Sequence, residues 1–449
     1  MEAGYVARLV DLVDPRRQQL HGMDFEEARR RVLSGDPEAV RGIPGSFALV
    51  ARDGETVRMA RSLDRPLRFF LAKEVEGPML VTAERIDTLA SALDEMGYAD
   101  QFHPSYTRMV PAHHVTTLQL IGCPDPNPIH RRFVDALPEA LPADIDRIGE
   151  VYVGALLDEI DRWLDAIDGD PEHGPKAPIG VAFSGGVDSG AVLVGLHHRL
   201  LARGQSAARL KAFTLAVDGG GEDLDQAREF LRRLDLDFLH EPIEVEASAV
   251  DPIAAVAVIE DYKRLDVECA AVALALLGAV RERYPDWRLI ADGDGGDENF
   301  KDYPIEENPE LTIRSVVNNP MLYQEGWGVE AVKHSLTYSG GFSRGCVRTF
   351  APARHLGFDG FSPFTRPGVV AAAAAIPFRE LATGSHERLY ALKGEAVRRG
   401  VARRLGVDFP VFPKRRFQHG AVSEAVVAER YADDPAGRRY RQHFLSLYS

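Results

Sequence analysis

The stretch that decides the fold is "VAFSGGVDSGAVLVGLHHRL", Val181 to Leu200. An apolar run stops at the Ser-Gly-Gly of 184–186, and the Val-Asp-Ser of 187–189 leads directly into a helical pattern. Glycines let a backbone approach an anion, and N–H groups at a helix start and serine hydroxyls can donate to it. A carboxylate there can hold a hard cation that accompanies phosphate. The pattern predicts a phosphate-binding loop made by Ser184, Gly185, Gly186, Asp188 and Ser189.

The sequence around this loop alternates between strand and helix patterns. Strands are expected at 178–183, 211–217, 237–245 and 287–293, and helices at 190–203, at 223–234 and before residue 282. Such alternation predicts a parallel sheet with helices on both faces. In sheets of this kind, ligands bind beyond the carboxyl ends of the strands, where the predicted loop lies.

Composition excludes several classes of protein. The chain has 449 residues, enough for two or three domains, and a net charge of −15, which opposes an extended nucleic-acid contact. Its three cysteines have no metal-ligand spacing. The first residues lack the apolar core of a signal peptide, and the apolar run at 269–280 is too short to span a membrane. We therefore expect a cytoplasmic protein without a membrane segment and a buried helix at 269–280.

A second loop, "IADGDGGDENF" at 290–300, also follows an apolar strand. It places Asp292, Asp294, Asp297 and Glu298 within seven positions. An EF-hand is excluded because a glycine stands where its third liganding residue should be, whereas a solvated acidic turn stays open. Both loops belong to the same sheet edge, so Asp188 and Asp297 are expected to share Mg²⁺ ions.

The first loop resembles the pyrophosphate loop of the ATP pyrophosphatase (PP-loop) superfamily, and it lacks the lysine of a P-loop. With the second loop it resembles the synthetase domain of the glutamine-dependent (type B) asparagine synthetases and of the β-lactam and carbapenam synthetases. The resemblance extends to "IEDYKRLDVECAAVALAL" and to residues 354–377. It implies that ATP and Mg²⁺ activate a small-molecule carboxylate as an acyl-adenylate, that pyrophosphate leaves, and that an amine then forms an amide.

The same resemblance implies roles for further residues. Near the C-terminus, "FPKRRFQHGAV" at 412–422 makes Lys414 the candidate for stabilising charge on the phosphates, although a solvated basic run is an alternative. Asp294 replaces a family glutamate, where the lactam-forming branch carries a tyrosine, so its role as the base stays open. Glu325 and Glu330 are candidates for a supporting carboxylate. Adenine and ribose contacts are implied for Ala182, Phe183, Leu215 and Gly293.

The first 120 residues read as short strands with turns at Asp53-Gly54 and Glu76-Gly77. They resemble a glutaminase domain of the N-terminal-nucleophile (Ntn) type, which needs a cysteine as its first residue. Here Met1 is followed by Glu2, and the first cysteine is Cys123. We therefore expect a degenerate glutaminase-like domain at 1–125, a linker at 126–147 and an ATP-dependent synthetase domain at 148–449.

The sequence thus predicts an α/β fold and an AMP-forming amide ligase that does not hydrolyse glutamine. The amine comes from the substrate itself, from a second molecule or from ammonia. A PP-loop enzyme that modifies tRNA and a catalytically inactive scaffold are the alternative functions. The substrates and the oligomeric state stay open, with a homodimer among the alternatives.

Overall fold

The structure is a computed structural model, and it describes residues 6–118, 120–121, 125–134, 137–219, 221–302, 305, 311–319, 346–413 and 438–448. The chain divides into two compact units. The first unit contains the described residues up to 134 together with 444–448. The second contains the remaining described residues from 137 onward, except residue 346.

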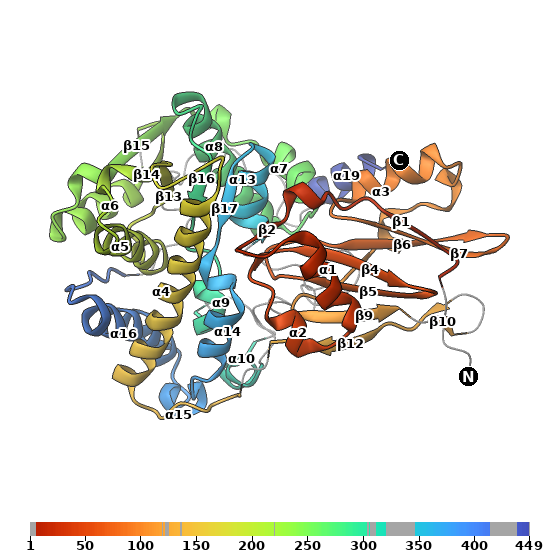
Figure 1. Ribbon diagram of the computed structural model, residues 1–449. Helices are drawn as coiled ribbons and strands as arrows, with labels where there is room; N and C mark the ends of the chain where they lie inside the picture. Colours follow the sequence, from red (N-terminus) through yellow and green to blue (C-terminus); the bar gives the residue numbers. More distant parts are fainter. Residues whose placement is uncertain are drawn as a thin grey trace. The chain divides into compact units, whose positions relative to one another are not determined.

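The first unit contains two four-stranded sheets that share one core (Figure 1). Val50 and Met59 of one sheet join Phe69 and Leu80 of the other in a single buried cluster. Helix α3 (Ile86–Glu95) covers the outer face of the first sheet, and helix α1 (Phe25–Ser34) contacts β4 (Ala48–Asp53) and β5 (Thr56–Arg61) of the second. The first sheet has the order β1 (Arg8–Asp11), β7 (Gly77–Ala83), β6 (Arg68–Glu74) and β8 (Arg108–Met109). The second has the order β12 (Ile129–Arg132), β9 (His114–Leu118), β5 (Thr56–Arg61) and β4 (Ala48–Asp53).

Both predicted hairpins are present, and each turn is shifted by one residue from the predicted pair, to 54–55 and 75–76. In β4–β5, Asp53 pairs with Thr56 across a two-residue turn, and in β6–β7, Glu74 pairs with Gly77. The helices α1 (Phe25–Ser34) and α2 (Pro37–Arg41) stand where only strands were expected, while α3 (Ile86–Glu95) follows β7. The residues that cap α1 are of types common at helix ends: Asp24 accepts a hydrogen bond from the Glu27 N–H, and Gly35 ends the helix with φ 69°. Short strand pairs complete the unit: β2 (Gln19–Leu20) with β3 (Gly45–Ser46), and β10 (Leu120–Ile121) with β11 (Asp125–Pro126).

The boundary between the units differs from the sequence-based expectation. Strand β12 lies in the stretch expected to be a linker, where it pairs with β9. The last described residues, 444–448, belong to the first unit, and Tyr448 packs its ring edge-on against Phe102. Pairing between distant segments therefore extends the first unit beyond the predicted boundary at residue 125.

The second unit is a five-stranded, fully parallel sheet between helices, as predicted. The spatial order is β15 (His240–Val245), β14 (Leu210–Val217), β13 (Ile179–Ala182), β16 (Leu289–Ala291) and β17 (Asp359–Phe361). Strand β17, in the stretch "FDGF", was not predicted, because three residues are too few for a periodic signal. The predicted buried helix at 269–280 is confirmed as part of α8.

The helices connect the strands in chain order and cover the sheet. Helices α5 (Val187–Ala202) and α6 (Glu222–Arg233) contact β14 (Figure 1). Helix α8 (Arg264–Arg283) lies in the connection from β15, at one edge of the sheet, to β16, which pairs with β13 on the side away from β14. The helices of this unit are α4 (Ile145–Gly169), α5 (Val187–Ala202), α6 (Glu222–Arg233), α7 (Pro252–Ile259), α8 (Arg264–Arg283), α9 (Gly296–Phe300), α10 (Ile313–Asn318), α13 (Ala351–His355), α14 (Pro367–Ala374), α15 (Phe378–Ala382) and α16 (His386–Leu405). Helix α19 (Arg438–Ser446) leads into the last residues.

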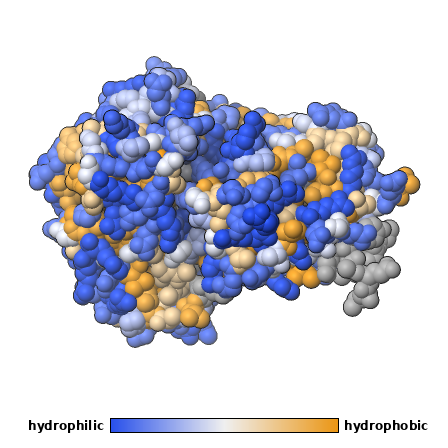
Figure 2. Space-filling view, in the orientation of Figure 1, coloured by the Kyte–Doolittle hydropathy of each residue, from blue (hydrophilic) through white to orange (hydrophobic). Residues whose placement is uncertain are grey.

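The visible face of the molecule is mostly hydrophilic, with apolar residues in smaller groups (Figure 2). No helix in the described part of the chain has both the length and the apolar character needed to cross a membrane.

Candidate functional site

The two predicted loops lie beside each other at one position in the sheet. Strands β13 and β16 are hydrogen-bonded neighbours, and the chain visits them first and fourth among the five strands. The strand order reverses between them, so the connections leave in opposite directions and open a crevice at their carboxyl ends. The loops after β13 and β16 therefore line the position where ligands bind in sheets of this type.

The first loop has the local structure of an anion-binding turn. Gly185 has φ 73°, and a Cβ there would lie 2.7 Å from the Ala227 nitrogen of α6, so only glycine fits. Gly186 is the N-cap of α5 and has no side chain to bond the free N–H groups of the first turn. The Ser184 N–H donates to Ser189 Oγ at 3.3 Å, which folds the loop over the start of the helix.

The second loop packs directly against the first. A Cβ on Gly293 would lie 2.6 Å from the Ser189 nitrogen. A Cβ on Gly296 would lie 2.3 Å from Asp188 Oδ1. The glycines of the second loop are thus required by the backbone and carboxylate of the first, and the two loops form one site.

Three carboxylates and one ammonium meet where the loops touch. The Lys393 ammonium, from α16, donates to Asp188 Oδ2 at 2.7 Å and also to Asp297 Oδ1, and it forms an ion pair with Asp302 Oδ2 at 3.0 Å. Burial alone lowers the pKa of Lys393, but the three carboxylates together raise that pKa well above its usual value. Lys393 therefore stays protonated at any physiological pH.

Two carboxylates of this cluster, Asp188 and Asp297, could contribute to a magnesium ion that arrives with phosphates. Three carboxylates against one ammonium leave two negative charges, and the Asp188 and Asp297 side chains are 19% and 21% exposed. Among the described residues, no group of three or more His, Cys, Asp or Glu side chains is arranged to hold a metal. Mg²⁺ is commonly held by one or two carboxylates plus substrate phosphates, which matches the predicted pair.

The other acidic residues of the second loop have different surroundings. Asp292 is buried, where its Oδ1 accepts from the Asp294 N–H at 2.9 Å and its Oδ2 accepts from the Ser362 hydroxyl at 2.8 Å. It fixes the loop to the end of β17. Glu298 is buried, and its Oε1 lies 3.8 Å from Arg348 Nη2. Unlike Asp297, which pairs with Lys393 and is partly exposed, Asp292 and Glu298 are buried.

Asp294 is the titratable group of the site whose pKa lies near neutrality. Burial raises the pKa of its carboxyl group to about 7, while the charge of Arg348 and the N–H of Thr349, which donates to Oδ2 at 3.0 Å, lower it. Glu298 adds a smaller upward effect. A carboxyl group with this pKa can accept a proton at neutral pH, which is the property required of a general base.

The residues implied for nucleotide binding lie on the same sheet edge. Ala182 ends β13, Phe183 follows it, and Gly293 lies beyond the end of β16. Leu215 lies near the carboxyl end of β14. The side chains of Phe183 and Leu215 are buried, so they support the strand ends more than they offer a contact surface. Lys414, Glu325 and Glu330 lie outside the described residues.

Sequence reasoning missed Lys393 and the residues behind it. The Asn299 amide of α9 donates from Nδ2 to the Tyr152 hydroxyl at 3.2 Å and to the Phe364 carbonyl at 3.0 Å. Tyr152, on α4, is buried. Lys393 is 96 residues from Asp297 in the sequence, within a helix rich in basic residues, and no local pattern distinguishes it.

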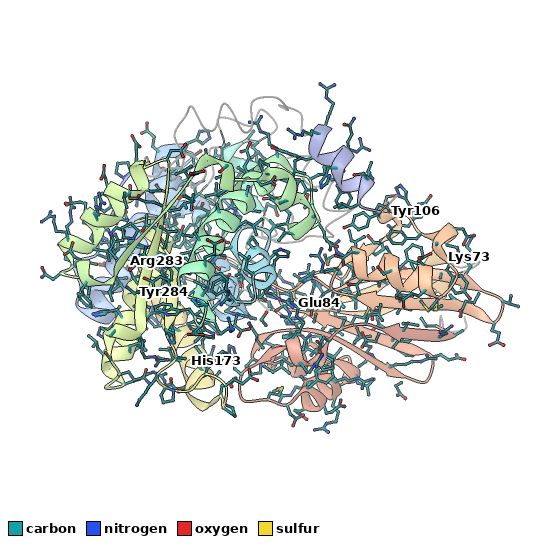
Figure 3. The ribbon with its side chains drawn as sticks, turned by 90° about the horizontal axis from the view of Figure 1, so that it is seen from above. Lys73, Glu84, Tyr106, His173, Arg283 and Tyr284 are labelled. Atoms are coloured by element: carbon teal, nitrogen blue, oxygen red, sulfur yellow. The ribbon has the colours of Figure 1, made fainter. Side chains whose placement is uncertain are left out.

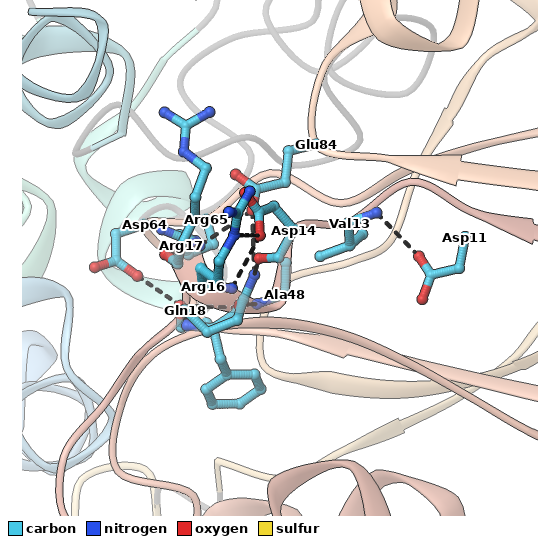
Figure 4. Close-up of polar contacts among 12 residues, drawn as sticks. Asp11, Val13, Asp14, Arg16, Arg17, Gln18, Ala48, Asp64, Arg65 and Glu84 are labelled. Atoms are coloured by element: carbon cyan, nitrogen blue, oxygen red, sulfur yellow. Dashed lines mark hydrogen bonds and ion pairs between the residues drawn. The ribbon is translucent and has the colours of Figure 1, made fainter. Parts of the chain in front are cut away.

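Polar clusters elsewhere have structural roles. Glu241 forms ion pairs with Lys211 and Arg283, each at 2.8 Å, at the amino ends of β14 and β15, which is the edge opposite the site. Figure 3 labels Arg283, the last residue of α8, beside Tyr284. In the first unit, Glu84 accepts from Arg65 at 3.1 Å and from Gln18 at 3.3 Å, which joins the N-terminal segment to the sheets (Figure 4).

Residues 6–118 contain no cysteine.

Comparison with known families agrees with this geometry. Residues 175–339 match the family model of asparagine synthase. This segment is therefore similar to an asparagine synthase domain. The matched segment includes both loops of the site, whereas Lys393 and Lys414 lie beyond it. No curated protein matches the sequence. The match of this segment implies ATP-dependent amide ligase activity at a general level.

Proposed function

We propose that this protein adenylates the carboxylate of a small molecule with ATP, releases pyrophosphate and joins the acyl group to an amine without hydrolysing glutamine. The activated carboxylate and the amine belong to one molecule or to two. The second unit contains the proposed active site, and its loops follow the PP-loop pattern. The family match covers residues 175–339 alone, and the adenylation step and the independence from glutamine are proposed in addition to it.

The observation that supports the proposal is the convergence of Asp188 and Asp297 at the reversal of the strand order. Each carboxylate follows a different strand, and both contact the ammonium of Lys393. A transferring phosphate chain placed there would meet the uncapped start of α5, two carboxylates for its magnesium ions and a fixed positive charge. This is the set of groups that adenylation requires.

In the proposed mechanism, the first loop binds the β and γ phosphates as one leaving group. Mg²⁺, held by Asp188 and Asp297, would supply charge neutralisation to the phosphates. Lys393 adds a fixed positive charge beside these carboxylates, and Lys414 is proposed to act on the α-phosphate. Asp294 then accepts the proton of the attacking amine, because its pKa of about 7 leaves a large fraction ionised at neutral pH.

The nitrogen is proposed to come from an amine and not from glutamine. The layering of the first unit, helix, sheet, sheet and helix, supports its descent from a glutaminase-like domain. Its residues 6–118 offer no thiol nucleophile. Buried arginines occupy its interior: the Arg61 guanidinium donates to the main-chain carbonyls of Val110, Ser62, Leu63 and Arg65.

Product analysis tests the proposed function. The purified protein is incubated with MgATP and a panel of amino acids and other small carboxylates, and nucleotides are separated by chromatography. AMP with pyrophosphate is expected, together with exchange of labelled pyrophosphate into ATP. ADP as the main product would contradict the adenylation step. Absence of any nucleotide turnover across the panel would favour the inactive scaffold.

A further inference from the structure

Helices α4 and α16 cross with their backbones in contact. A Cβ on Gly149 would lie 2.2 Å from the Ala396 carbonyl oxygen and 2.8 Å from the Gly400 nitrogen. A Cβ on Gly400 would lie 2.2 Å from the Gly149 carbonyl oxygen. These neighbours are backbone atoms, which cannot rotate away as side chains do. A methyl group on either glycine would therefore push the helices apart by about 1 Å, since carbon atoms require roughly 3.5 Å.

The crossing lies on the same side of α16 as the lysine of the site. Lys393 precedes Gly400 by seven residues, or two helical turns, so the two share a face. Its ammonium reaches three carboxylates at the loops, and its side chain is 8% exposed. On α4, Tyr152 follows Gly149 by one turn and accepts the hydrogen bond from Asn299. Each helix thus carries both a glycine of the crossing and a residue that contacts the site or its support, Lys393 on α16 and Tyr152 on α4.

A third glycine at this interface faces a side chain instead of the backbone of the other helix. Gly154, also on α4, faces α16 through the Arg404 guanidinium, which a Cβ would approach to 2.9 Å. That group is the mobile end of a long side chain, 43% exposed, and can move aside. The backbone contact is therefore made at Gly149 and Gly400, in line with Lys393.

We propose that the Gly149–Gly400 crossing is a positioning device that sets how deeply Lys393 reaches between Asp188 and Asp297. The two glycines are positioning residues and touch no substrate. The importance of this position for turnover rests on the proposed function. The placement of Lys393 does not rest on the proposed function, because the ion pairs of Lys393 are present in the protein without nucleotide.

The direct test measures the reactivity of Lys393 toward an amine-specific acylating reagent, using peptide mapping of the nucleotide-free protein. In the wild-type protein Lys393 should react slowly. Gly149→Ala and Gly400→Ala should each raise its labelling rate several-fold. Gly154→Ala is the matched control and should label at the wild-type rate. Lys301 is an internal control, because it is 8% exposed and bonds three carbonyls at the end of α10.

The outcomes separate positioning from general loosening. Faster labelling of Lys393 with unchanged labelling of Lys301 supports the proposal. Equal acceleration of both lysines shows that the glycines only stabilise the fold, and wild-type labelling in both alanine variants also overturns the proposal. If neither alanine variant folds, the crossing serves folding and the proposal is wrong as stated.

A double-mutant cycle adds an independent readout once pyrophosphate exchange has been observed. Gly400→Ala should lower exchange in the wild-type background and have little further effect beside Lys393→Met, since both changes remove the same group from the site. Additive losses would mean that the crossing acts on something other than Lys393. A protein without exchange activity would refute the proposed function and leave the labelling result valid.

Discussion

Asp188, Asp292, Asp294 and Asp297 have the same side chain and lie in three different kinds of surroundings. Asp292 is enclosed by hydrogen bonds that join the loop to β17, and Asp294 is held by a backbone N–H with a pKa near 7. Asp188 and Asp297 share an ammonium and keep part of their surface exposed. At the residue scale, surroundings and not residue type therefore assign the roles.

Replacing either exposed carboxylate should stop adenylation. Asp188→Asn and Asp297→Asn each remove a charged oxygen from the proposed Mg²⁺ site while keeping the shape of the side chain. Pyrophosphate exchange should fall by at least about a hundredfold, the size seen when a charge-stabilising group is removed from an active site. Thermal unfolding should show both proteins folded.

Asp165→Asn is the control for these variants. Asp165 is 70% exposed and pairs with Arg203 at 2.6 Å on the surface, so its loss should cost roughly 0–1 kcal/mol of stability and no activity. Wild-type exchange in Asp188→Asn would show that this carboxylate holds no metal.

The pKa of Asp294 predicts the pH dependence of amide formation. Burial raises the folded pKa to about 7, so the carboxyl group is protonated below that pH and cannot accept the amine proton. Single-turnover amide formation from preformed adenylate should therefore slow as the pH falls below 7. Asp294→Asn should lower the rate of this step, remove its acid limb and leave pyrophosphate exchange largely intact. An unchanged acid limb in the variant would assign the titration to another group.

At the scale of elements, glycines bring the two loops and the helices around them into contact. Gly185 adopts a left-handed conformation against α6, and Gly293 and Gly296 admit the backbone and the carboxylate of the first loop. Each contact joins a loop that follows one strand to an element elsewhere in the chain. The site is therefore sensitive to a single methyl group added at any of these glycines.

Gly185→Ala should destabilise the protein and weaken nucleotide binding. A left-handed alanine costs roughly 1–2 kcal/mol, and the new methyl group would also meet the α6 backbone at 2.7 Å. Gly204→Ala is the matched control, because Gly204 has φ 69° with nothing within 4 Å of its Cβ position. Denaturant unfolding should show a larger loss for Gly185→Ala than for Gly204→Ala. Equal losses would mean that the loop adapts to the methyl group.

At the scale of the whole molecule, the chain combines a unit with a proposed active site and a unit without a described one. The site residues described here all belong to the second unit. The first unit has a complete core of its own between its two sheets. Because the net charge of −15 repels polyanions from the molecule as a whole, we expect a phosphate chain to bind only at a small local site such as the first loop.

The nitrogen source is a prediction about the molecule as a whole. Residues 6–118 contain no cysteine, and Cys123 lacks the free α-amine that serves as the base in an N-terminal nucleophile, so the first unit should release no glutamate from glutamine, with or without ATP. Incubation with ¹⁵N-amide glutamine, an active carboxylate and no other amine should give an unlabelled product or none. Product labelled with ¹⁵N in the absence of another amidotransferase would show that a working glutaminase is present. Addition of ammonia or a free amine is the positive control.

The sequence by itself determined the features that depend on neighbours in the chain. The strand–loop–helix at 181–200, the acidic loop at 290–300 and the buried helix α8 are local patterns of hydrophobicity and turn residues, and all three are present. The parallel sheet followed from the alternation of strand and helix. The carboxyl ends of parallel strands meet at one edge, so the proximity of Asp188 and Asp297 was also predictable.

Only the tertiary structure decided the features that depend on distant segments. Lys393 enters the site because α16 crosses α4 at two glycines, and nothing within its own helix marks it. Strand β17 exists because three residues pair with β16, and β12 joins the first unit because it pairs with β9. Asp292 became structural because Ser362, 70 residues away, bonds its carboxylate. Such contacts are stabilised by packing and burial, which no local sequence pattern records.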